Sequence, residues 1–333
     1  MKADKKKNKP KQLLNSKKKS IDKKKYLYLG SAVILIAAAL LFYFLRDNKP
    51  LFNEELAYKD LKAQCDFGPR VPGTDAHEKA HKFIVENLKK YTDLVSEQAF
   101  TYKDKHDTAK IWNGCNIVAS FNKDKAARVL LCAHWDSRPW ADNDPDKSKQ
   151  TEPVMGANDG ASGVAVLLEI ARLLSIQKPD VGVDLVFFDL EDIGDYQADE
   201  GHPDYNPFAV GAEYFLKMNP DYVPAWGILL DMVGDKDLAI PKETNSVSRA
   251  SSVLDKVWQA AKKLGIKEFK DEDGGSVGDD HIPFLKKFIP VADLVQTPFP
   301  EYWHTTHDTP DKCSAESLSK IGRVLVEVIY NEK

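Results

Sequence analysis

Six groups of acidic and imidazole side chains stand out in the 333-residue sequence, because their types suit metal binding and proton transfer. They are His134 with Asp136, Asp159, the adjacent Glu191 and Asp192, Asp231, the run of Asp279, Asp280 and His281, and His304. Carboxylates and imidazoles, with no thiolate required, suit a catalytic zinc that keeps one coordination position open. Several carboxylates at the ends of apolar strands would also be costly to bury without a cation. The combination therefore predicts a zinc site with a separate carboxylate for proton transfer.

Each group has an ordinary structural interpretation when it is considered alone. Asp159 could cap the helix that follows it, and Asp136 could form an Asx turn. Glu191 and Asp192 could be a solvated pair at the end of a strand. A lone histidine such as His304 is more often a packed or surface residue than a ligand. The prediction depends on all six groups together.

The adjacency of Glu191 and Asp192 has its own chemical meaning. Neighbouring side chains on an extended backbone point in opposite directions. One carboxylate can then face the metal, while the other faces the substrate as a general acid/base.

The predicted strands bring these side chains to one edge of a sheet. Apolar, strand-like runs end at Ala133, Asp189 and Asp231, directly before or at the candidate groups. Continuous apolar runs such as residues 183–189 and 225–231 are typical of parallel strands buried on both faces. Ligands of open α/β sheets bind outside the carboxyl ends of the strands. We therefore expect three strands to deliver acidic or imidazole groups to the same rim.

Strands and helices alternate along the main part of the chain. This predicts a single three-layer αβα domain with a mostly parallel, mixed central sheet. Helices are expected at residues 76–91, 160–174, 248–264 and 315–330, and further strands at 116–121, 128–133 and 290–295. The polar sequence NKDK between residues 116–121 and 128–133 predicts that these two strands form a hairpin.

The N-terminal region has a different composition. Residues 1–25 contain twelve lysines and two aspartates, whereas residues 26–45 contain no charged residue. About 20 apolar residues span a ~30 Å hydrocarbon core, so residues 26–45 are predicted to be a transmembrane anchor. The basic tail should stay cytoplasmic, and after a linker at residues 46–53 the catalytic domain of residues 54–333 should be exported. A cleaved signal peptide is the less favoured alternative, because the apolar run is too long and no small-residue cleavage site follows.

The charge distribution argues against nucleic acid as a partner. The net charge is −4, of which residues 1–25 contribute +10 and residues 26–50 contribute +1, which leaves −15 for residues 51–333. Phosphate binding needs a basic surface instead. The cysteines, Cys65, Cys115, Cys132 and Cys313, form no CxxC pair and allow either up to two disulfides or buried free thiols.

Several motifs occur in an order and spacing that resembles the M28 zinc-peptidase superfamily, and more closely its glutaminyl cyclase branch (glutaminyl-peptide cyclotransferases). The motifs are HWDS, GANDGASGVAVLLEIAR, FFDLED, LLDMVG, DDHIPFL and TPFPEYWHTTHDT. The resemblance runs from about Leu51 to the C-terminus and is densest over residues 134–308. The HxD, NDGASG and HTxxDT features are shared with M28 aminopeptidases. The DDHIPFL and PFPxxWHT runs are cyclase-like, since aminopeptidases more usually carry Ser at the position of Asp279 and lack the Trp before the His.

The resemblance implies one zinc ion per chain. Its ligands would be Asp159, Asp192 and His304, and Glu191 would be the general acid/base. His134 and Asp136 match positions that bind metal in two-zinc aminopeptidases but only support the site in cyclases.

Further roles are implied for the surroundings of the zinc. Asp231 and Asp279 would form a supporting acidic hydrogen-bond network, and Trp303 would help to wall the glutamine pocket. Trp135 is a second candidate for that wall, with plain core packing as an equal alternative.

The sequence departs from the animal cyclases at several positions. Asp192 stands where they have Glu, and Asp293 stands where they have a His near the active site. Gly278 replaces a Gln before the acidic pair. Residues 194–208 do not align cleanly, so no pocket residue is assigned from them.

The implied reaction is the cyclisation of N-terminal glutamine, on peptides and exported proteins, to pyroglutamate with release of ammonia. The main alternative is a two-zinc aminopeptidase on the same scaffold. A non-enzymatic, membrane-tethered binding domain is a distant third, because such a domain has no need of the intact acidic set. The catalytic domain is expected to be monomeric.

Overall fold

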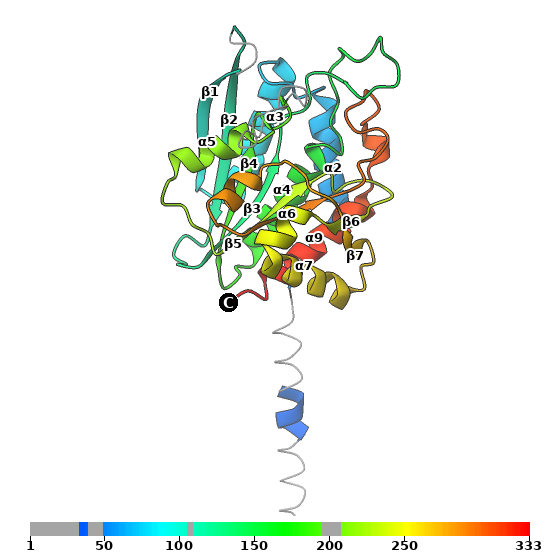
Figure 1. The fold of residues 1–333 in the computed structure, drawn as a ribbon. Coiled ribbons are helices and arrows are strands. Elements are labelled where there is room, and N and C mark those ends of the chain that lie inside the picture. The colour runs from blue at the N-terminus through cyan, green and yellow to red at the C-terminus, as the bar shows by residue number, and fades with distance from the viewer. Residues whose placement is uncertain (1–32, 39–48, 105–108, 195–207) are drawn as a thin grey trace, which may run out of the picture. The chain divides into compact units, whose positions relative to one another are not determined.

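A six-stranded mixed sheet forms the centre of the computed structural model, which describes residues 33–38, 49–104, 109–194 and 208–333 (Figure 1). The strand order is β1-β2-β4-β3-β5-β8. The bounds are β1 Val95–Lys103, β2 Ile111–Phe121, β3 Arg128–His134, β4 Gly182–Phe188, β5 Trp226–Asp231 and β8 Val291–Val295. Strands β4, β3, β5 and β8 are parallel, and β1 and β2 add an antiparallel edge. The predicted mostly parallel, mixed sheet is confirmed.

The predicted hairpin between residues 116–121 and 128–133 is wrong. Both strands exist, but β4 lies between them and pairs antiparallel with β2 and parallel with β3. Strand β3 is buried over almost its whole length, as is β4, so each needs a hydrogen-bonding neighbour on both sides. Strand β4 is the neighbour of β3 on one side, and β5 is its neighbour on the other.

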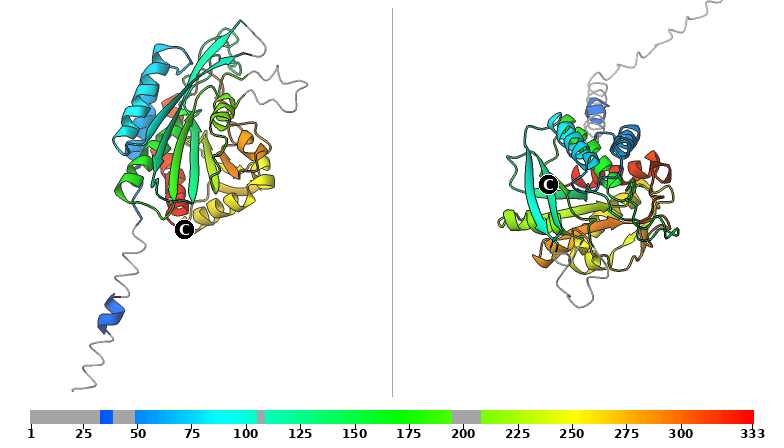
Figure 2. Two further views of the ribbon diagram at one scale, coloured as in Figure 1. Left: turned by 90° about the vertical axis from the view of Figure 1, so that its left-hand side faces the viewer. Right: turned by 90° about the horizontal axis from the view of Figure 1, so that it is seen from above.

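Helices cover both faces of the sheet (Figure 2). Side chains of α2, α3, α4, α7 and α9 share one core cluster with one face, and those of α5 and α8 share a second cluster with the other. The bounds are α2 Glu54–Asp66, α3 Asp75–Lys89, α4 Ala161–Ile176, α5 Val210–Met218, α7 Ser251–Leu264, α8 Ile282–Lys286 and α9 Ala315–Ile329. Neighbouring residues of β3 enter opposite clusters, as with Leu130 and Leu131. The apolar strand runs are therefore explained by burial on both faces.

Three of the predicted helices match α3, α4 and α9 to within two residues at each end. The prediction for residues 248–264 is only partly right, because the chain forms α6 (Thr244–Arg249) and α7, with a break at Ala250. Ala250 has φ of −133°, which is outside the helical region. The smaller elements are β6 Ile240–Lys242, β7 Phe269–Asp273 and the 3-10 turn Pro310–Lys312.

The N-terminal predictions fall mainly outside the described residues. The chain divides into a unit of residues 1–48 and a unit of residues 49–333. Of the predicted anchor at residues 26–45, only residues 33–38 are described, and they are helical. No helix in the described part of the chain has the length and apolar character needed to cross a membrane. Most of the loop at residues 194–208 is also outside the described residues.

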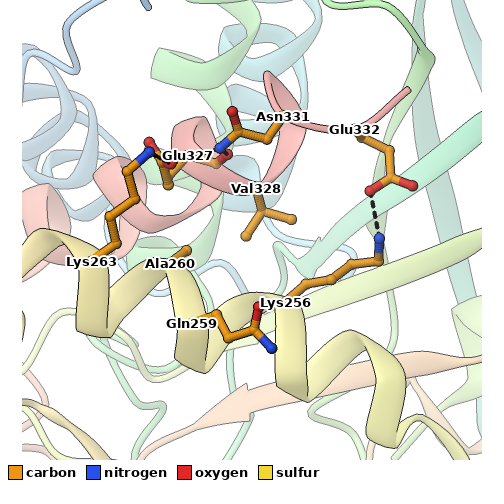
Figure 3. A pocket seen from close by; sticks show the side chains of 8 residues that line it. All are labelled: Lys256, Gln259, Ala260, Lys263, Glu327, Val328, Asn331 and Glu332. Atoms are coloured by element: carbon orange, nitrogen blue, oxygen red, sulfur yellow. Dashed lines mark hydrogen bonds and ion pairs between the residues drawn. The ribbon is translucent and has the colours of Figure 1, made fainter. Parts of the chain in front are cut away.

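A surface cavity of about 330 Å³ lies between α7 and α9 (Figure 3). Two ion pairs of 2.7 Å, Lys256–Glu332 and Lys263–Glu327, line it. None of its lining residues belongs to the six candidate groups. The carboxylates of this cavity are neutralised by lysines, so the chemistry predicted from the sequence lies elsewhere.

Candidate metal centre

The carboxyl ends of β3, β4 and β5 meet at one rim, as the sequence predicts. His134 ends β3, and its Nε2 atom lies 3.0 Å from an Asp159 oxygen and 3.2 Å from an Asp231 oxygen at the end of β5. Glu191 follows β4, and its Oε2 atom lies 3.9 Å from Nδ1 of His134. Side chains that are distant in the sequence therefore form one buried cluster.

Asp159, Asp192 and His304, the predicted zinc ligands, are brought together. Their ligand atoms lie within 4.8 Å of one another. Nε2 of His304 is 3.5 Å from Oδ2 of Asp159 and 3.3 Å from Oδ1 of Asp192. Nitrogen and oxygen ligands at ~2.0–2.2 Å from a tetrahedral zinc are separated from each other by roughly 3.3–3.5 Å. The donor set therefore fits zinc in both composition and spacing.

An unsatisfied buried oxygen also points to a cation. Oδ2 of Asp192 is buried and receives no hydrogen bond from any described residue. Buried polar atoms are normally paired, so this oxygen lacks a partner that a metal ion would supply. Burial raises the pKa of the Asp192 carboxyl, and the neighbouring Asp159 raises it further. A cation beside the two carboxylates would oppose both effects.

The loop before α4 presents Asp159 to the cluster. Gly160, and not Asp159, is the N-cap of α4, so the capping interpretation of Asp159 is wrong. Gly160 has φ of +87°, and a Cβ atom at this position would lie 2.8 Å from the Asp136 carbonyl oxygen and from Cε1 of His134. Only glycine fits both the backbone conformation and the space. The NDGASG motif therefore has a steric reason.

Asp308 and Arg70 hold this loop in place, and neither has a role among those predicted from the sequence. The Asp308 carboxylate accepts hydrogen bonds from the backbone N–H groups of Asn158 (2.8 Å) and Asp159 (3.0 Å). The fully buried Arg70 donates to the carbonyl oxygens of Met155 (2.8 Å) and Gly156 (2.7 Å). Asp308 lies in the quoted HTTHDT segment, so its motif was a usable signal. Arg70 lies far upstream of the motifs, and no sequence signal indicated its role.

Glu191 and Asp192 lie in a turn after β4 and not in an extended strand. Strand β4 ends at Phe188, and Leu190 has φ of +60°. The premise that both carboxylates leave an extended strand is therefore wrong, although they do face different partners. Asp136 stabilises the turn, because its two oxygens accept the backbone N–H groups of Glu191 (3.2 Å) and Asp192 (3.1 Å).

Glu191 lies beside the ligand set but outside it. Burial raises the pKa of its carboxyl well above the usual range, and the charge of the neighbouring His134 opposes the rise. A carboxyl whose pKa is moved toward neutrality is suited to proton transfer.

His304 is oriented from two sides. The Trp303 ring stacks on the imidazole at a centroid distance of 3.9 Å, and Phe299 packs on Trp303 at 4.2 Å. Oδ1 of Asp142 lies 3.6 Å from Nδ1 of His304. Arg138 fixes Asp142 with a bidentate pair of 2.7 and 2.6 Å. A carboxylate behind a ligating histidine is a common outer-shell arrangement, and Asp142 is not among the residues predicted from the sequence.

A second ligand set exists next to the first. Ligand atoms of His134, Asp159 and Asp231 also lie within 4.8 Å of one another, and Asp159 belongs to both sets. The arrangement accommodates either one or two cations.

The acidic network continues behind Asp231. Burial, together with the charge of Asp231, raises the pKa of Asp279 to about 7. His281 lies between two further carboxylates, with 3.3 Å from Nε2 to Glu243 and 3.7 Å from Nδ1 to Asp293. Asp293, whose role the sequence left open, thus faces an imidazole, and Glu243 is an additional member that the sequence did not indicate.

Trp135 does not line an accessible pocket. Its side chain is fully buried, stacks on His77 at 4.1 Å and donates its indole N–H to the Cys115 carbonyl oxygen. The expectation that Trp135 walls the substrate pocket is therefore corrected to core packing. Trp303 is partly exposed beside His304, so its proposed role in the pocket stays a prediction.

In comparisons with known proteins, residues 116–329 match the family model of peptidase family M28. A crystal structure of Bacteroides thetaiotaomicron glutaminyl cyclase, bound to N-acetylhistamine, is 40% identical, with a TM-score of 0.81 over 86% of this chain and 100% of that chain. A Zn-dependent exopeptidase from Parabacteroides distasonis is 38% identical, with a TM-score of 0.78 over 85% and 99% of the two chains. Bovine glutaminyl-peptide cyclotransferase is 28% identical over 63% of this chain, which spans 65% of the bovine protein.

The position of Asp142 predicts an effect on metal affinity. Asp142→Asn should weaken zinc binding about 10- to 100-fold, because it removes the charge behind His304. Asp146→Asn, in the same loop but exposed, is the matched control and should bind zinc normally. Competition of each purified variant against a chelator measures the affinity. Equal affinities in the two variants would remove Asp142 from the site.

Proposed function

The chain belongs to peptidase family M28, and we propose that it converts the N-terminal glutamine of peptides and proteins to pyroglutamate with release of ammonia. The observation that carries this proposal is the 40% identity to a bacterial glutaminyl cyclase over the whole length of that protein. The buried donor set with a separate carboxylate is the chemistry that such a reaction needs. The protein is therefore an aminoacyltransferase on a peptidase scaffold.

Zinc is the cofactor that the residues fit. Asp159, Asp192 and His304 would hold it, and the unpaired Oδ2 atom of Asp192 would gain a partner. When bound, the ion supplies a Lewis acid that polarises the γ-amide carbonyl group and stabilises negative charge on its oxygen. The similarity to a Zn-dependent exopeptidase supports the choice of metal. We propose that this centre holds one ion per chain.

Glu191 moves the proton. Its carboxylate takes a proton from the α-amine as the amine nitrogen bonds to the side-chain carbonyl carbon (Cδ) of the glutamine. The bond from that carbon to the amide nitrogen then breaks, and Glu191 returns the proton to the leaving nitrogen, which departs as ammonia. The reaction is intramolecular, and well-oriented intramolecular reactions reach effective molarities of about 10⁵–10⁸ M. The protein thus mainly has to fold the side chain back and exclude water.

The remaining residues support this step. Asp231 and Asp279 form the acidic network next to His134. We propose that these two carboxyl groups orient the attacking amine and provide a polar environment for it. Trp303, stacked on His304 and partly exposed, would wall the glutamine pocket.

A two-zinc aminopeptidase is the second candidate function. The second ligand set of His134, Asp159 and Asp231 favours it, as does the exopeptidase name of a similar structure. An aminopeptidase would hydrolyse the first peptide bond and would accept Leu- or Ala-initiated peptides.

Substrate choice separates the two functions. A Gln-initiated peptide should lose ammonia, and a Leu-initiated peptide should yield no free leucine, as followed by mass spectrometry. The rate with the Gln-peptide should rise from about pH 6 to about pH 8, because the attacking α-amine must be neutral and titrates near pH ~8. Rapid release of leucine, with Gln-peptides left uncyclised, would establish the aminopeptidase.

The role of Glu191 predicts a variant that separates chemistry from metal binding. Glu191→Gln should keep zinc and fold normally but lose about 10²- to 10⁴-fold in turnover, the usual contribution of a general acid/base. Glu301→Gln, an exposed change near Trp303, is the control. If Glu191→Gln lost its zinc, Glu191 would be a ligand, and its role would have to be exchanged with that of Asp192.

Metal removal tests the number of catalytic ions. Chelation should abolish activity. Adding zinc back should restore the activity fully once one ion per chain is bound in this centre. Asp159→Ala and His304→Ala should each lose the ion together with activity, because each removes one of three protein ligands. A requirement for two ions bound in this centre would favour the aminopeptidase.

We further propose that residues 26–45 anchor the chain and that the catalytic unit is exported. The uncharged run after twelve lysines supports this topology. Protease added to the outer face of cytoplasmic-membrane vesicles should digest the catalytic unit and spare the basic tail. Protection of the catalytic unit would contradict export.

A further inference from the structure

Three potential ligands from three different elements meet at the edge of the sheet. They are His81 on α3, Glu97 on β1 and Cys115 on β2. Their ligand atoms lie within 4.8 Å of one another, and Nε2 of His81 is 3.2 Å from Oε2 of Glu97. None of the three belongs to the candidate metal centre, and the proposed function uses none of them.

The strand register explains why these side chains converge. Glu97 pairs with Ile117, and Ala99 pairs with Cys115, in the antiparallel ladder of β1 and β2. Glu97 and Cys115 are therefore diagonal neighbours on one face of the sheet, within reach of each other. Helix α3 contacts β1 and brings His81 over this face.

The contact between His81 and Glu97 is not an ordinary hydrogen bond. Nε2 of His81 is buried and makes no hydrogen bond within the described residues, although the carboxylate oxygen is only 3.2 Å away. Ligand atoms of a tetrahedral zinc lie roughly 3.3–3.5 Å apart without bonding to each other. The distance between these two atoms is therefore close to that between two ligands of the same ion.

We propose that His81, Glu97 and Cys115 form a second, peripheral site for one divalent transition-metal ion, most naturally zinc. The thiolate and the carboxylate neutralise the charge of the ion, and the imidazole is a neutral third ligand. A set of one sulfur, one nitrogen and one oxygen donor suits zinc and related metals, whereas Ca²⁺ and Mg²⁺ take oxygen ligands. Solvent water completes the coordination.

The surroundings leave the ligand atoms accessible. Lys89 lies 3.7 Å from Oε1 of Glu97, so Oε2 remains for an ion. Cys115 is half-buried, whereas the other three cysteines are buried, and all four are free thiols. Burial lowers the pKa of His81, which keeps its ring nitrogen unprotonated near neutral pH. Burial also raises the pKa of the Cys115 thiol to about 11, so the ion must displace its proton on binding.

A bound ion would join α3 to the β1–β2 edge next to the strand that leads to Glu191. The Cys115 backbone N–H donates to the Asp189 carboxylate at 2.7 Å, and His77 on α3 contacts the same carboxylate at 2.9 Å. An ion that binds only the folded state stabilises it by mass action. The site would thus be structural, and its occupancy is independent of the proposed cyclisation.

Cobalt(II) is the probe that separates this site from the catalytic centre. Cobalt bound to a thiolate has a charge-transfer absorption in the near ultraviolet, and Asp159, Asp192 and His304 contain no sulfur. The purified full-length chain, freed of metal, should show this absorption when cobalt is added, with one thiolate-bound ion per chain at saturation. Cys115→Ser and His81→Ala should lose or strongly weaken the absorption, whereas Cys65→Ser, a change at a buried cysteine, should keep it.

A second measurement guards against variants that fail to fold. Zinc should slow the reaction of Cys115 with a thiol reagent in the wild-type chain, and should not do so in Glu97→Gln. Circular dichroism and cyclisation of a Gln-peptide should be unchanged in Glu97→Gln, because this residue is outside the catalytic centre. The proposal is overturned if the wild-type chain shows no thiolate absorption with cobalt and no protection by zinc, or if Cys115→Ser keeps the absorption.

Discussion

The burial of many carboxylates at one rim of the sheet is the constraint on which the rest of the structure depends. Asp159, Asp192, Asp231 and Glu191 are all buried there, and among the described residues His134 contacts Asp159 while Arg138 and His304 contact Asp192. Buried carboxylates without cations are strongly unfavourable. Backbone N–H groups donate to Asp136 and Asp308, and the charge that remains on the other carboxylates is what a metal ion would neutralise. The catalytic power proposed for the site comes from the same unbalanced charge.

The sequence predicts the fold well where burial alone decides it. Continuous apolar runs identify β3, β4 and β5, and helical periodicity identifies α3, α4 and α9, because these elements bury whole faces. The order of the strands is decided differently. The polar NKDK sequence is compatible with a hairpin, but the pairing of β3 with β4 on one side and β5 on the other depends on contacts distant in sequence. Strand β1 was missed, since it is largely exposed and lacks an apolar run.

The ligand types in the site could be predicted from sequence, but the residues that position them could not. Carboxylates and imidazoles at strand ends are visible as motifs, whereas Arg70, Asp142 and Glu243 act through spatial proximity to residues far along the chain. Trp135 illustrates the converse error, because a motif aromatic next to His134 was expected in the pocket and packs in the core. Exposure, which decides between these roles, is a property of the folded chain.

The free energy of unfolding of the metal-free chain as a function of pH tests the central claim most directly. Burial raises the folded-state pKa of Asp231 to about 6 and of Asp279 to about 7, against about 3.9 for an unfolded aspartate. The folded state thus binds more protons, and its stability should fall as pH rises from about 4 to about 7. Denaturant titrations should show this fall without zinc and a much smaller one with zinc bound. The account would be contradicted if the metal-free chain had the same free energy of unfolding at pH 5 and at pH 7.5, and if adding zinc did not change that free energy.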